Sequence, residues 1–140
     1  MVIDNTLLDI LTAQAKSSPR LRMHYDLRDS TEDGSQRMLN AIEPGTVIEA
    51  HRHTGTSETV VALRGVAEEV FFDADGNETG RYRLTPGGME PGSIAAIQVP
   101  MGQYHTLRSL ESGTVFIEFK NGRYDPESDK CLLNLKSGLT

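Results

Sequence analysis

The chain has 140 residues, the length of one ordinary domain. Its 20 acidic side chains outnumber its 14 basic ones, and the resulting formal charge of −6 argues against a general nucleic-acid-binding protein. A single cysteine, Cys131, excludes an internal disulfide and a multi-cysteine zinc cluster. No apolar run approaches the ~18 residues of a membrane span, and the N-terminus carries acids where a secretion signal carries basic residues. We therefore expect a cytoplasmic protein that binds neither membranes nor nucleic acids.

The N-terminal segment has the periodicity of a short helix over about residues 6–16. Leu7, Leu8 and Leu11 repeat at helical spacing, and Thr6 is the expected N-cap. Because a helix of about ten residues is marginal alone, it needs the rest of the fold to stay helical.

After this helix the apolar period changes to two, in short runs bounded by glycine and proline turns. We expect strands at residues 23–27, 37–42, 47–53, 59–64, 66–72, 81–84, 94–99, 105–110 and 114–119. Regular short strands of this kind are typical of an antiparallel sandwich or barrel. We place the barrel at about 36–120 and a C-terminal extension at about 121–140, all within a single domain, 1–140. No helical pattern alternates with the strands, which disfavours a parallel α/β sheet.

Three of the four histidines fall in two short clusters. His51 and His53 are two residues apart, so on a strand they face the same side. Glu58 opens the next antiparallel strand beside them, and His105 begins a later one. Three imidazole nitrogens and a carboxylate oxygen suit one divalent transition metal (Fe, Mn, Ni, Zn or Co), with positions open for water or substrate. The alternative is a hydrogen-bonded polar interior without a metal.

Four further side chains are candidates for the pocket around this set. Gln98 is a polar residue in an otherwise apolar run and is a candidate partner for a ligand imidazole. Arg37 and Asn40 lie early among the predicted strands, where they could orient an anionic or hydroxylated ligand. His24 occupies an alternating strand position and either lines the pocket or lies at the surface.

Residues 73–77 resemble the opening of a calcium-binding loop. A calcium EF-hand needs flanking helices and a glutamate at loop position 12, where this chain has Leu84. We therefore expect a hairpin turn, with Gly76 at positive φ. Cys131 has no histidine near it in sequence and is expected to be an ordinary thiol.

Two motifs resemble those of the cupin superfamily. The run G-x5-H-x-H-x4-E-x6-G from Gly45 looks like the first cupin motif, and P-x-G-x2-H from Pro100 looks like the core of the second. Over residues 5–127 the chain resembles the WbuC-type cupin-fold metalloproteins, through stretches such as SPRLRMHYDLRD, IQVPMGQYHTL and LESGTVFIEFKNGRYDP. The resemblance implies a mainly β, double-stranded β-helix (jelly-roll barrel) with a short N-terminal helix. It also implies metal at the four residues named above and a homodimer.

The WbuC family is associated with O-antigen and surface-polysaccharide clusters, so the resemblance implies a sugar or nucleotide-sugar ligand. Three functions stay open. The protein is an enzyme whose metal acts as a Lewis acid in isomerisation or epimerisation, an iron-dependent dioxygenase, or a non-catalytic module that uses the metal to bind a sugar or organic acid. Because one fold and one ligand set serve unrelated chemistries, the residues do not separate the three or assign a catalytic group.

Overall fold

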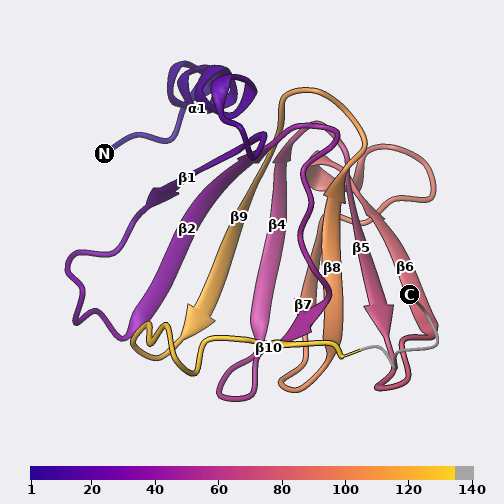
Figure 1. Ribbon diagram of the computed structural model, residues 1–140. Coiled ribbons are helices and arrows are strands. Elements are labelled where there is room, and N and C mark those ends of the chain that lie inside the picture. Colours follow the sequence, from indigo (N-terminus) through magenta and orange to yellow (C-terminus); the bar gives the residue numbers. More distant parts are fainter. Residues whose placement is uncertain (135–140) are drawn as a thin grey trace.

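The computed structural model describes residues 1–134, and in them two five-stranded sheets face each other (Figure 1). The helices and strands are α1 (Asn5–Ser17), β1 (Arg22–Asp26), β2 (Ser35–Ile42), β3 (His51–Arg52), β4 (Glu58–Arg64), β5 (Ala67–Phe72), β6 (Glu78–Leu84), the 3-10 turn η1 (Pro86–Gly88), β7 (Ala96–Val99), β8 (Tyr104–Ser109), β9 (Thr114–Asn121) and β10 (Cys131–Leu132). The first sheet has the order β1-β2-β9-β4-β7 and the second β10-β3-β8-β5-β6. The chain passes repeatedly from one sheet to the other, so the predicted mainly β jelly roll with one N-terminal helix is confirmed.

Helix α1 packs on the outer side of the first sheet, where Figure 1 shows it beside β1 and β2. Its buried residues Leu8, Leu11 and Ala15 form an apolar cluster with residues of β2 and β9. The expected N-cap Thr6 is wrong, because the helix begins one residue earlier and the Asp4 carboxylate accepts the Leu7 N–H at 3.0 Å. In the described part of the chain, no helix has the length and apolar character needed to cross a membrane.

The strands differ from the expected ones around His51 and His53. The strand expected over residues 47–53 is reduced to His51–Arg52, because a ladder partner is present only there: His51 pairs with His105, and β10 pairs on the other side. Strands β1 and β10 lie outside the range 36–120 given to the barrel and add an edge to each sheet. The hairpin turn at residues 73–77 is confirmed, with Gly76 at a φ of 88°.

The inner face of the first sheet carries charged side chains on three of its strands, β1, β9 and β4, with Met38 of β2 between two of them. Strand pairing sets Met38 of β2 opposite Asp26 of β1 and opposite Glu118 of β9. One row away, Lys120 of β9 lies opposite Glu58 of β4. Because side chains on a strand alternate between faces, these residues point into the space between the sheets. An apolar core fills the other end of that space, built from Ile42, Val60, Ala62, Ala67, Leu84, Leu107 and Phe116.

Gly65 joins β4 to β5 and requires the absence of a side chain. Its φ is 73°, and a Cβ atom there would lie 2.7 Å from the Thr114 Cα. Gly113 also has a positive φ, 85°, but a Cβ there would meet open space.

We therefore expect Gly65→Ala to lower the free energy of unfolding by about 3 kcal/mol, because steric overlap adds to the left-handed backbone cost. Gly113→Ala should lower it by only about 1 kcal/mol, the backbone cost alone. Urea denaturation of the two variants measures the difference, and equal losses would contradict the proposed clash.

Candidate metal centre

Three buried imidazoles meet on neighbouring segments of the second sheet. His51 lies on β3 and is paired with His105 on β8, and His53 follows β3 directly. The ring centroid of His51 lies 4.5 Å from that of His105 and 5.0 Å from that of His53. One nitrogen from each of the three rings lies within 4.8 Å of the others, an arrangement that could hold a metal ion. The structure therefore brings together the three histidines singled out in the sequence.

Backbone carbonyls set the tautomers of two of these rings. The Nδ1 of His51 lies 2.7 Å from the Glu49 carbonyl oxygen, and the Nδ1 of His53 lies 2.5 Å from that of Asp129. A carbonyl oxygen only accepts hydrogen bonds, so each Nδ1 must carry the proton. In the neutral imidazoles the Nε2 atoms are then left with free lone pairs, the form that binds a metal. Burial lowers the pKa of His51 to about 4, which keeps that ring neutral at pH 7.

The third ring is held by a carboxylate that the sequence interpretation missed. Glu69 of β5 is fully buried and accepts a hydrogen bond from the Nδ1 of His105. Burial raises the pKa of Glu69 to about 7, against the lowering effect of this hydrogen bond. For His105, burial acts to lower the pKa, but the bond to Glu69 outweighs it and the pKa is raised. Because side chains alternate along a strand, Glu69 faces the same side as Ala67, which lies in the apolar core. This alternation over residues 66–72 is the sequence feature that could have identified Glu69 as an inward-facing carboxylate.

The fourth predicted ligand, Glu58, lies at the edge of the three histidines. It is buried, and its Oε2 lies 2.9 Å from the Nε2 of His53, outside hydrogen-bond geometry. A carboxylate oxygen thus faces an imidazole nitrogen whose proton is on the other side of the ring. Glu58 is not part of the group of three close nitrogens.

Charged groups from β9 and the C-terminal segment complete a pocket of about 160 Å³ around the histidines. The Lys120 Nζ lies 3.0 Å from a carboxylate oxygen of Asp129, and Glu118 accepts a hydrogen bond from the Asn40 amide at 3.2 Å. Burial, and then the Glu58 carboxylate, raise the pKa of Glu118 to about 7. Asn40 therefore lies in the pocket for which it was a candidate, whereas Glu118, Lys120 and Asp129 were not expected there.

The remaining candidates lie elsewhere. His24 and Arg37 line a neighbouring cavity, where Arg37 forms an ion pair with Asp33 at 2.8 Å. The prediction for Gln98 is wrong: it is exposed, because on β7 the inward positions are those of Ile97 and Val99. Its polar side chain is explained by contact with water.

Comparison with known proteins identifies a family and a fold. The model of a family described as "Domain of unknown function (DUF6016)" matches residues 3–84. No curated protein matches the chain.

Many solved structures are similar to the chain, among them those of three proteins of known name. Staphylococcus aureus CapF, a "capsular polysaccharide assembling protein", superposes with a TM-score of 0.68 and 20% identity, over 84% of this chain and 33% of CapF. Bacillus subtilis oxalate decarboxylase superposes with a TM-score of 0.60 and 18% identity, over 80% of this chain and 27% of the decarboxylase. KdgF from Halomonas sp. superposes with a TM-score of 0.57 and 16% identity, over 79% of this chain and 87% of KdgF. The chain thus spans about a third of CapF. At such identities the likeness shows the fold alone, which is the jelly-roll fold expected from the cupin-like motifs.

The tautomers can be read directly from the protein before any metal is added. We expect long-range proton–nitrogen NMR spectra at pH 7.5 to show His51 and His53 protonated at Nδ1, because each faces a carbonyl acceptor. The exposed His24 should show the ordinary Nε2–H form and serves as the internal control. Protonation of His51 or His53 at Nε2 would contradict the arrangement described.

Glu69 should matter for metal affinity although it would not touch the ion. We expect Glu69→Ala to weaken zinc binding roughly 10- to 100-fold, because His105 loses the acceptor that orients it. Its neighbour Glu68 faces Arg81 and Arg108 on the outer side, so Glu68→Ala is the matched control and should bind zinc like the wild type. Competition with a chelator measures both, and equal affinities would argue against this role.

Proposed function

We propose that this chain, which belongs to the DUF6016 family, is a metal-binding cupin whose ion holds a sugar or organic acid inside the barrel. The observation that carries the proposal is the orientation of the three imidazoles. Each Nδ1 has an oxygen partner, so the three Nε2 lone pairs are left for one cation.

The buried atoms at the centre fit a cation better than a polar interior without metal. Within residues 1–134, the Nε2 atoms of His53 and His105 are buried and have no hydrogen-bond partner. The Glu58 oxygen near His53 is a further acceptor, so the group lacks donors. Leaving such atoms unpaired costs about 1–3 kcal/mol each. Imidazole with carboxylate is a donor set suited to Fe, Mn, Ni, Zn or Co.

Residues of the pocket supply groups that could act on a bound molecule. When bound, the metal would polarise a carbonyl or hydroxyl oxygen of the ligand as a Lewis acid. Glu118 of β9 lines the same pocket and accepts a hydrogen bond from Asn40, and in this proposal its carboxyl group exchanges a proton with that ligand. Such a proton exchange is what isomerisation or epimerisation of a sugar requires.

The biological setting is part of the proposal. We place the protein in the cytoplasm, as a homodimer of the WbuC type acting in surface-polysaccharide biosynthesis. The shared fold with CapF supports this setting, since the name of CapF describes assembly of a capsular polysaccharide. The resemblance of the sequence motifs supports the WbuC assignment and the dimer.

Metal retention tests the proposal. We expect untagged wild-type protein to retain about one equivalent of a transition metal after dialysis, and His53→Ala or His105→Ala to retain below about a tenth, since each removes a ligand. Glu58→Gln should retain more than the histidine variants, because an amide oxygen can still approach the ion. His24→Ala is the control and should match the wild type. Elemental analysis and the metal-induced rise in Tm are the two readouts.

Full metal occupancy in the His51→Ala, His53→Ala double variant would overturn the proposal, provided circular dichroism shows a folded protein. Elemental analysis also separates the alternatives. Native iron together with oxygen uptake in the presence of a ligand would favour a dioxygenase over an isomerase. Binding of sugars without turnover would favour a non-catalytic module.

A further inference from the structure

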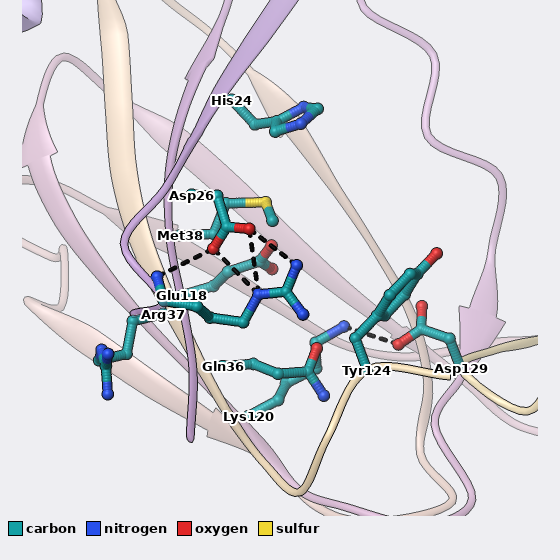
Figure 2. A pocket seen from close by; sticks show the side chains of 10 residues that line it. His24, Asp26, Gln36, Arg37, Met38, Glu118, Lys120, Tyr124 and Asp129 are labelled. Atoms are coloured by element: carbon teal, nitrogen blue, oxygen red, sulfur yellow. Dashed lines mark hydrogen bonds and ion pairs between the residues drawn. The ribbon is translucent and has the colours of Figure 1, made fainter. Parts of the chain in front are cut away.

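A second cavity, of about 340 Å³, adjoins the metal pocket (Figure 2). The two cavities share Glu118, Lys120 and Asp129 in their walls. A volume of this size is at the lower end of the range of small-molecule sites, whereas the 160 Å³ around the histidines is too small for more than part of a ligand. A molecule that reaches the histidines would therefore extend into the second cavity.

The floor of this cavity is formed by the inner face of the first sheet, on strands β1, β2 and β9. Met38 of β2 lies between Asp26 of β1 and Glu118 of β9 in one row of the sheet. Figure 2 shows Tyr124 and Asp129, from the segment after β9, on the side opposite Asp26 and Met38. The cavity thus depends on β1 and on the C-terminal segment, both of which lie outside the expected barrel range 36–120.

The cations of the cavity are already neutralised by carboxylates. The ion pairs are Arg28 with Asp26 at 2.7 Å, Lys120 with Asp129 at 3.0 Å, and Arg37 with Asp33 at 2.8 Å. A phosphate or sulfate group would have to displace one of these carboxylates before it could use a cation, and it would face Glu118 as well. The charges therefore favour an uncharged ligand, to which paired carboxylates and guanidinium groups still offer hydrogen bonds.

One wall of the cavity is aromatic and apolar. Tyr124 is 42% exposed, and the Arg28 guanidinium carbon lies 5.8 Å from the centroid of its ring. With Met38 on the floor, this wall offers a surface for the C–H face of a saturated ring, while the ion pairs offer partners to its hydroxyl groups. A compound with one apolar face and a rim of hydroxyls matches both features.

We propose that the second cavity binds an uncharged, hydroxyl-rich ring of monosaccharide size, stacked against Tyr124 with its reacting end toward the three histidines. This inference rests on the proposed function for the position of the reacting end. It narrows the ligand class from sugars and organic acids in general to neutral sugars.

The test is a binding screen on zinc-loaded and on EDTA-treated protein. The probes are glucose, galactose, rhamnose and N-acetylglucosamine, together with glucose 1-phosphate, galactose 1-phosphate and citrate, measured by saturation-transfer NMR and calorimetry. Tyr124→Ala removes the aromatic wall, and Met38→Trp fills the cavity. Tyr25→Ala is the matched control, because Tyr25 is 40% exposed and lies opposite Leu39, whose side chain packs under α1.

We expect at least one neutral sugar to bind with a Kd of about 1 mM or lower. Tyr124→Ala and Met38→Trp should weaken it roughly fivefold or more, the equivalent of one lost ring contact, without changing the zinc content. Tyr25→Ala should bind like the wild type. The inference is overturned if no neutral sugar binds, if both cavity variants bind like the wild type, or if the phosphorylated sugars bind more than tenfold tighter than the neutral ones.

The two proposals can fail separately. If the protein binds zinc but shows no sugar binding that depends on Tyr124, the metal centre is supported and the second cavity is ruled out as a ligand site. If the protein binds no metal but binds a sugar in a way that depends on Tyr124, the second cavity is supported as a ligand site and the proposed function is ruled out.

Discussion

The hydrogen bonds at the three Nδ1 atoms are the interaction on which the candidate site depends. They fix the direction of each ring and leave the Nε2 atoms facing one another. Two of the three acceptors are main-chain carbonyls, of Glu49 and Asp129. The orientations of His51 and His53 are therefore determined by the path of the backbone, just before β3 at Glu49 and just before β10 at Asp129. Only the orientation of His105 depends on a neighbouring side chain, that of Glu69.

The C-terminal segment has a larger part in this site than its position in the chain indicates. The carbonyl oxygen of Asp129 accepts a hydrogen bond from the Nδ1–H of His53, and its carboxylate accepts one from the Lys120 ammonium. Strand β10 then pairs with β3 beside His51. One short segment thus orients a candidate metal ligand, His53, pairs with the cation of Lys120 and forms a wall of the second cavity. Loss of its packing would affect the centre and the cavity together.

The inner face of the first sheet has an apolar end and a polar end, and the position of a residue along its strand decides in which of the two it lies. Val60 and Phe116 lie in the apolar core, whereas Glu58 and Lys120 on the same two strands lie at the polar end. The apolar end supplies the burial that stabilises the sheets. The polar end carries buried charges that are costly unless paired. Its pairs, Lys120 with Asp129 and Glu118 with Asn40, show how that cost is offset at the mouth of the site.

The sequence alone determined the strand-rich architecture, the turn at residues 73–77, and the same-side placement of His51 and His53. These follow from local rules, since alternation and turn geometry act over a few residues. The expected strand order added Glu58, at the start of the next strand, and His105, at the start of a later one, to that set, and the cupin-like motifs have the same four residues. Gln98 was misassigned because alternation tells which residues share a face but not which face is buried.

Only the tertiary structure decided what surrounds the histidines. Asp129 reaches His53 from 76 positions along the chain, and Glu69 reaches His105 from 36. No local pattern encodes such meetings, because they depend on how the edge strands and the C-terminal segment pack after the sheets have formed. The identities of the candidate ligands were therefore readable from the sequence, whereas their tautomers, their partners and the adjoining cavity were set by long-range packing.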